Sequence, residues 1–168
     1  MKNEYLITKS NELIQKSRFE LSLTEQKLVA YICTLINPMH DKEDQVYTIS
    51  ISNFIKLCNI TDSGKNYNDI KKIIKKLADQ SYWMMLPDGS ETLVRWIEKP
   101  KISDKTIKFK LDEDMSPYLL QLKEKFTTYE IKNILNMKSC YAPRLYEILK
   151  SYEFVHEVTY SIDELKKI

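Results

Sequence analysis

The hydrophobic pattern of this chain changes its period at residue 82. Over residues 65–81 apolar side chains recur every three or four residues, which is typical of an amphipathic helix. From residue 82 onward they alternate with polar side chains, which is typical of strands that bury one face. A shorter helix capped by Ser50 or Ser52, and a turn at 59–64, precede the long helix. A helix-turn-helix followed by strands is the order of a winged helix.

Three strands are predicted after the change of period. Residues 82–86 and 92–99 flank the turn signal Pro87-Asp88-Gly89-Ser90, and a loop at 100–104 leads to a third strand at 105–111. Together with the helix-turn-helix, these strands predict an α+β fold. The expected architecture is a winged helix with a small antiparallel sheet and additional helices.

The segments around this unit are predicted to be mostly helical. Ser22-Leu23-Thr24-Glu25 has the form of a capping box, in which the serine and the glutamate satisfy each other's backbone N–H groups. The expected flanking helices cover residues 10–17, 26–37, 117–125, 128–137 and 139–154. Short strands are expected at 46–49 and 158–160.

A second serine-capped helix is predicted to begin close to the end of the sequence. The segment Tyr160-Ser161-Ile162-Asp163-Glu164-Leu165 is similar to the strand and helix start at residues 47–54. We therefore expect residues 1–155 to form an N-terminal winged-helix domain for DNA binding and dimerisation. Residues 156–168 are expected to be a linker and the start of a truncated second winged-helix domain.

The distribution of charge indicates DNA binding more clearly than its total. The chain has 26 basic and 24 acidic residues, a net charge of +2. Lysines gather opposite the apolar stripe of the 65–81 helix and along the predicted strands, where they could neutralise phosphates. The alternative is a solvated surface helix, because lysine is a good helix former. The candidate DNA-binding residues are Lys65, Asn68, Lys71, Lys72, Lys75, Lys76, Arg95, Lys99 and Lys101.

The predicted strands also carry large apolar side chains that favour self-association. They are more than one sheet face can comfortably cover, and a three-stranded sheet leaves edges that can pair with another chain. The candidate dimer interface is Trp83, Trp96, Ile97, Ile107 and Phe109. Two alternatives remain. The C-terminal helices could cover this face and leave a monomer, or the aromatic residues could stack on single-stranded nucleic acid.

No pattern of residues indicates catalysis, a metal site or a cofactor. The only two histidines, His40 and His156, are far apart, and the three cysteines have no metal-ligand spacing. No phosphate-binding glycine loop is present, since the chain has only two glycines. No apolar run is long enough to span a bilayer, and the N-terminus lacks a secretion signal. We expect a cytoplasmic binding protein that is not an enzyme and has no membrane partner.

Four segments of the chain resemble the two signatures of a known family. Lys9-Ser10-Asn11-Glu12-Leu13-Ile14 and Leu21-Ser22-Leu23-Thr24-Glu25-Gln26-Lys27-Leu28 resemble the opening of RepB/RepE-type, iteron-binding plasmid replication initiators. Phe126-Thr127-Thr128-Tyr129, followed by 138–147 with Ser139-Cys140-Tyr141-Ala142-Pro143-Arg144-Leu145-Tyr146-Glu147, resembles their second signature. The matches cover nearly the whole chain in the right order.

This resemblance implies a function as well as a fold. It implies tandem winged-helix domains that bind repeated origin DNA, form homodimers that repress their own gene, and start replication with host replication proteins. Arg144 is expected to be structural and paired locally, with Leu145 and Ile148 buried. The alternatives are a winged-helix transcriptional regulator and a dimerisation module that does not bind DNA.

Overall fold

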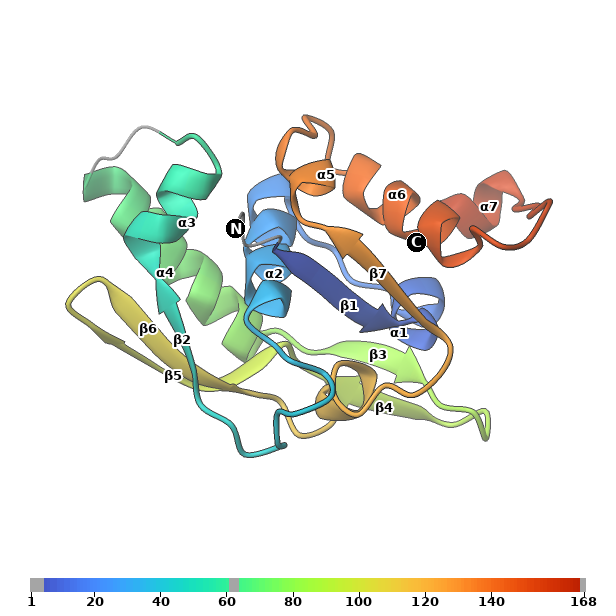
Figure 1. Ribbon diagram of the computed structural model, residues 1–168, viewed down its shortest axis with the longest axis horizontal. Coiled ribbons are helices and arrows are strands. Elements are labelled where there is room, and N and C mark those ends of the chain that lie inside the picture. Colours follow the sequence, from blue (N-terminus) through green and yellow to red (C-terminus); the bar gives the residue numbers. More distant parts are fainter. Residues whose placement is uncertain (1–4, 61–63, 167–168) are drawn as a thin grey trace.

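The winged helix predicted from the sequence is present in the computed structural model, which describes residues 5–60 and 64–166 (Figure 1). Its strands form an antiparallel sheet in the order β2-β6-β5. Antiparallel order lets the short tip between β5 and β6 act as a wing beside the helix-turn-helix. The elements of this unit are α2 (Leu23–Thr34), β2 (Tyr47–Ser50), α3 (Ile51–Leu57), α4 (Gly64–Asp79), β5 (Ile97–Ser103) and β6 (Thr106–Leu111).

The first helix of the helix-turn-helix begins and ends as its sequence dictates. Ser50, not Ser52, caps α3, and its hydroxyl accepts a hydrogen bond from the backbone N–H of Asn53. Asn59 adopts a left-handed conformation (φ 52°) just after α3, which asparagine tolerates well. Of the turn predicted at 59–64, residues 61–63 lie outside the described residues.

Residues 92–99, predicted as one strand, belong to two different strands. The prediction of a loop at 100–104 is wrong, because residues 100–103 continue the second of these strands. β4 (Glu91–Val94) pairs with β3 (Tyr82–Met85) in a separate two-stranded sheet, whereas β5 continues to Ser103. β5 is an edge strand with a register shift between Glu98 and Lys101, and Pro100 falls in this bulge. A proline without an N–H is tolerated at such a position. The turn between β3 and β4 forms as predicted, with Gly89 at φ 84°.

The helix predicted at 128–137 is wrong, because the first part of it is a strand. β7 (Phe126–Glu130) pairs antiparallel with β1 (Leu6–Ser10), and only α5 (Lys132–Leu135) is helical. Burial alternates along β7, with Thr127 and Tyr129 buried and Phe126 and Thr128 exposed. The helix predicted at 117–125 reduces to a single 3₁₀ turn, η1 (Ser116–Tyr118).

The C-terminal helices are shorter than predicted, and no strand forms at 158–160. α6 (Ala142–Ser151) packs against α1 (Asn11–Lys16), and α7 (Ile162–Leu165) follows a loop. Both predicted capping boxes are confirmed, at Ser22–Glu25 and at Ser161–Glu164.

A buried charge cluster holds α6 against the rest of the domain. The Lys9 ammonium lies 2.6 Å from the Glu147 carboxylate, and Arg144 lies 3.5 Å from it. Arg144 also donates to the carbonyl of Ser17. Its predicted local pairing is confirmed by the ion pair with Glu147, three residues later. Burial raises the pKa of Glu147, but Lys9 and Arg144 outweigh this and hold it below the ordinary value. The prediction for Leu145 is wrong, since its side chain is 47% exposed.

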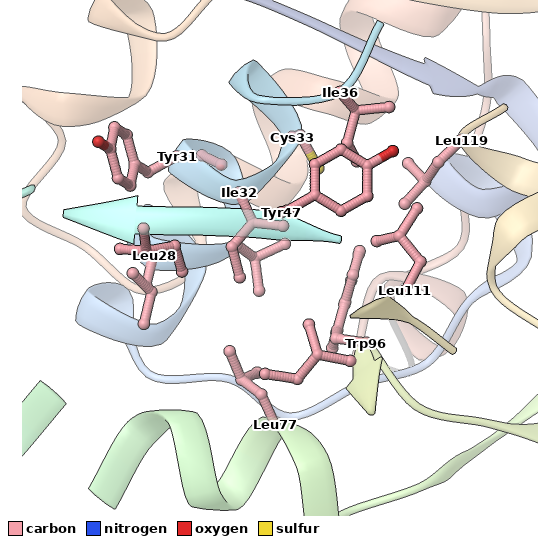
Figure 2. Packing of buried hydrophobic residues seen from close by; sticks show 14 of the residues in the cluster. Leu28, Tyr31, Ile32, Cys33, Ile36, Tyr47, Leu77, Trp96, Leu111 and Leu119 are labelled. Atoms are coloured by element: carbon pink, nitrogen blue, oxygen red, sulfur yellow. The ribbon is translucent and has the colours of Figure 1, made fainter. Parts of the chain in front are cut away.

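The core gathers around α2, which is buried along most of its length. Figure 2 shows Leu28 and Ile32 of α2, and Ile36 just beyond its end, together with Leu77 of α4 and Trp96. No helix in the described parts of the chain is long and apolar enough to cross a membrane.

Candidate nucleic-acid interface

The outward face of α4 carries most of the residues predicted to bind DNA. Ile70, Ile74 and Leu77 are buried on the inner face of the helix, so the opposite face points to solvent. α4 packs against α3 and β5 (Figure 1), and the residues of its opposite face are exposed. The exposed predicted residues on α4 are Lys65, Asn68, Lys71, Lys72 and Lys75.

The ion pairs on this face are weak and exchangeable. Lys72 lies 3.5 Å from Asp69, and Lys75 pairs with Asp79, one helical turn away in each case. The two lysine side chains are 79% and 78% exposed, and exposed pairs of this kind contribute about 0–1 kcal/mol. Lys71 forms no ion pair with any residue in the described parts of the chain. A phosphate can therefore compete for these ammonium groups.

Lys76 differs from its neighbours on α4, because it is tied to the interior. Its ammonium lies 2.8 Å from the Glu25 carboxylate, and the same carboxylate accepts a 2.9 Å hydrogen bond from the Ser22 backbone N–H. Glu25 is buried. Lys76 thus joins α4 to the start of α2, and its ammonium is less free to bind a phosphate than those of its neighbours on α4.

The β5–β6 hairpin adds further cations beside α4. Lys99 and Lys101, two of the residues predicted to bind DNA, are exposed on β5. Lys105 is exposed at the tip of the hairpin, and Lys108 is exposed on β6. The last two belong to the strand predicted at 105–111, whose alternation already places Lys108 opposite the apolar face. The exposed lysines of helix and hairpin thus lie on two elements that pack against each other, α4 and β5 with its partner strand.

Arg95 belongs to a different environment from these lysines. It lies between β4 and β5, and its Nε is 3.0 Å from the Asp112 carboxylate, which is buried. Asp112 Oδ1 also accepts from the backbone N–H of Asp114. Arg95 therefore neutralises a buried carboxylate where the two hairpins meet.

The residues predicted to form a dimer interface are divided between the core and the surface. Trp96, Ile97, Ile107 and Phe109 are at most 2% exposed, so the rest of the domain already covers them and they cannot reach a partner in this fold. The premise that the sheet leaves these side chains uncovered is wrong. Trp83 is 57% exposed, on the outer face of β3–β4.

Trp83 is part of an exposed apolar surface that was not predicted from the sequence. Its partner in the register of β3 and β4 is Leu93, which is 46% exposed, and Met85 on the same face is 45% exposed. Leu93 and Met85 could have been found from the alternation around Trp83, since residues two apart or directly opposite share a face.

Other chemistry on the molecule is limited. Among the residues that the structure describes, no three His, Cys, Asp or Glu side chains are placed to hold a metal ion. A cavity of about 210 Å³ is lined by Phe19, Lys76, Gln80 and Tyr82, among others. The chain turns after β6 at the acidic residues 112–114. Among these, Asp112 forms an ion pair with Arg95.

Comparison with known proteins agrees with this architecture. A curated "Replication initiation protein" of Escherichia coli is 26% identical over 175 residues, which cover 98% of this chain and 54% of that protein. The chain therefore spans about half the length of this relative. A crystal structure of the Pi initiator protein in complex with iteron DNA superposes with a TM-score of 0.76 at 20% identity, over 99% of this chain and 73% of that one.

The family comparison is the most decisive. The family described as "Initiator Replication protein, WH1" matches residues 6–150, which include every strand and all helices except part of α6 and α7 among the described elements. The chain therefore belongs to the WH1 family of initiator replication proteins.

Proposed function

We propose that this chain is the N-terminal domain of a plasmid replication initiator that binds repeated origin DNA. The observation that carries the proposal is the open lysine face of α4, formed by Lys65, Lys71, Lys72 and Lys75. Its charge is directed outward from a helix whose other face is firmly buried. Such a helix can lie against a duplex while its position in the domain stays fixed.

The relatives support this function. The superposed Pi initiator is in complex with iteron DNA, and the curated relative is a replication initiation protein. Lysine contacts phosphates but reads bases less well than arginine, and the chain has three arginines, two of them engaged by Asp112 and Glu147. We therefore propose that this domain supplies mainly sequence-independent affinity. A second winged-helix domain, beginning near Ser161, supplies most of the base-specific contacts.

Self-association is the second part of the proposal. We assign it to the outer face of β3–β4, defined by Trp83, Met85 and Leu93, with a second copy of the chain as the partner. The sheet has only two strands, so both strands have a free edge that can pair with the same hairpin of another copy. Homodimers would form in this way through an apolar surface on β3–β4, whereas the lysine face is on α4.

The domain acts by binding and assembly in the cytoplasm, without a catalytic step or a cofactor. Host replication proteins are further partners in this proposal. A transcriptional regulator of the same fold would bind one operator, whereas an initiator binds tandem repeats. A pure dimerisation module would not bind DNA.

The decisive experiment is a titration followed by a footprint. The chain is titrated with a random-sequence duplex at low salt, where binding is expected and its absence would leave only a dimerisation module. The protein that carries this domain is then footprinted on the region upstream of its own gene. Protection of evenly spaced tandem repeats is expected, whereas a single protected operator would favour the regulator.

A further inference from the structure

A cavity lies beside the C-terminal end of α4 and is lined by side chains from separate segments of the chain. Lys76 and Leu77 of α4 line one side, and residues 18–21, in the loop between α1 and α2, line another. Tyr82 of β3 and Trp96, the residue before β5, are also part of the lining. The cavity thus lies between α4, the loop before α2 and the start of the β3–β4 hairpin.

The volume of the cavity limits what it can hold. It is about 210 Å³, whereas pockets for drug-sized ligands have volumes of roughly 300–1,000 Å³. A cavity of about 150 Å³ can bind benzene. There is therefore room for one ring with a small substituent, and a nucleotide is too large.

The inner part of the cavity is apolar and aromatic. Leu77 and Trp96 are 1% and 2% exposed. The ring centroid of Phe19 lies 5.3 Å from those of both Tyr82 and Trp96. Side chains of this kind stabilise a ring by burying its surface and by edge-to-face or offset contacts. The lining thus favours a ligand with a flat, apolar body.

The rim of the cavity is charged, and cations outnumber anions there. Arg18 and Glu20 are exposed, and Lys76 is a second cation whose ammonium is paired with Glu25. Arg18 forms no ion pair with any residue in the described parts of the chain, unlike the other two arginines. A guanidinium can donate two parallel hydrogen bonds to a carboxylate. The rim thus favours an anionic group, and Arg18 is the residue placed to bind it.

Two aromatic residues of the lining also carry buried polar groups. The Trp96 indole N–H and the Tyr82 hydroxyl are shielded from solvent, and neither is hydrogen-bonded to any group in the described parts of the chain. A buried donor without an acceptor is unfavourable and is rare in folded proteins. An acceptor that reached these groups from the cavity would remove this cost, whereas the indole N–H has nothing to offer a donor. This second feature also favours a ligand that accepts hydrogen bonds.

We propose that this cavity is a binding site for a small aromatic carboxylate, with its ring against Phe19, Tyr82 and Leu77 and its carboxylate at Arg18. Lys76 adds a further attraction for the negative charge. Because Lys76 and Leu77 belong to α4, the bound ligand holds the end of this helix against the loop before α2 and stabilises the domain. The site does not depend on DNA binding by α4.

Benzoate is the probe for this site, and benzylamine is its matched control, with a similar ring and the opposite charge. Trp96 is the reporter, because it lines the cavity. The chain has two tryptophans, so both compounds are titrated into the Trp83→Phe variant, in which Trp96 is the one that remains. Benzoate is expected to change the Trp96 fluorescence in a saturable way, with a Kd of about 1 mM for a molecule of its size. It is also expected to raise the melting temperature, whereas benzylamine is expected to bind at least about tenfold more weakly.

Three exposed residues near the rim test the role of charge. Arg18→Gln is expected to weaken benzoate binding about two- to fivefold, and Glu20→Gln to strengthen it by up to about twofold, because the two side chains have opposite charges. Lys16→Gln is the control, since Lys16 is an exposed cation close to Arg18 in the sequence that does not line the cavity. It is expected to bind benzoate as the unsubstituted position does, and all three variants are expected to keep the original melting temperature.

Gln80→Phe tests the place of binding. Gln80 is exposed and lines the cavity, so a larger, apolar side chain there is expected to fill the opening and abolish benzoate binding without unfolding the domain. The site would be overturned if benzoate gave no saturable change up to about 20 mM, roughly twenty times the expected Kd. Equal affinities of Arg18→Gln and Lys16→Gln, or equal binding of benzylamine and benzoate, would overturn it as well.

Discussion

The two hairpins of this domain follow each other in the sequence, have the same alternating pattern, and have different exposed faces. β5–β6 is joined by β2 into a three-stranded sheet, buries Ile107 and Phe109, and exposes lysines. β3–β4 has no third strand, buries Met84 and Val94, and exposes Trp83 and Leu93. The alternation of apolar and polar side chains thus shows that one face of a hairpin is buried. The chemistry of its exposed face indicates the class of molecule that can bind there. Lysines fit a polyanion, and apolar side chains fit a protein.

The largest expected difference between the hairpins is in stability. Phe109→Ala in β6 should lower the free energy of unfolding by about 3–5 kcal/mol, because it leaves a cavity in the core. Leu93→Ala in β4 should lower it by less than about 1 kcal/mol, since that side chain is half exposed. Urea unfolding of both variants measures the two values. Equal losses would mean that the outer face of β3–β4 is covered in the free domain.

The next effect concerns self-association through β3–β4. Leu93→Lys should weaken the dimer by at least about tenfold, because a charge would be buried at the centre of an apolar interface. Leu145→Lys on α6 is the matched control, since the two leucines are 46% and 47% exposed. Sedimentation equilibrium at micromolar concentrations compares them. If only Leu145→Lys weakened the dimer, the interface would lie on α6 instead. If the original chain were a monomer, there would be no dimer interface on β3–β4.

A smaller effect is expected at the junction of the two hairpins. Arg95→Gln should lower the free energy of unfolding by about 1 kcal/mol, because it leaves the buried Asp112 carboxylate without its cation while Arg95 itself is 44% exposed. Its DNA affinity should stay within twofold of the original chain, roughly the scatter expected from a remote surface charge. Anisotropy titration checks this, and a clear loss of DNA affinity would make Arg95 a DNA contact.

The sequence predicted those parts of the fold that depend on neighbouring residues. The amphipathic α4, the turn at Gly89 and the capping boxes of Ser22 and Ser161 are all confirmed, because each is determined within a few residues. The β1–β7 sheet was missed because its pairing joins Thr8 to Thr128, 120 residues apart.

The same limit explains what was predicted about the site and what was not. The open lysines of α4 follow from helical period alone. The engagement of Lys76 by Glu25, across 51 residues, does not. Alternation also could not show that Trp96 and Phe109 are covered by other elements of the same chain, so buried core was interpreted as interface.

The most direct test of the account is the salt dependence of duplex binding by the chain with Lys71, Lys72 and Lys75 all replaced by glutamine. Lys76 is left in place, because it holds Glu25. The account predicts an unchanged fold and a log–log salt slope smaller by about 2.7, roughly 0.9 for each lysine that contacts a phosphate. A triple variant with the affinity and the slope of the original chain would contradict the assignment of α4 as the DNA-binding helix.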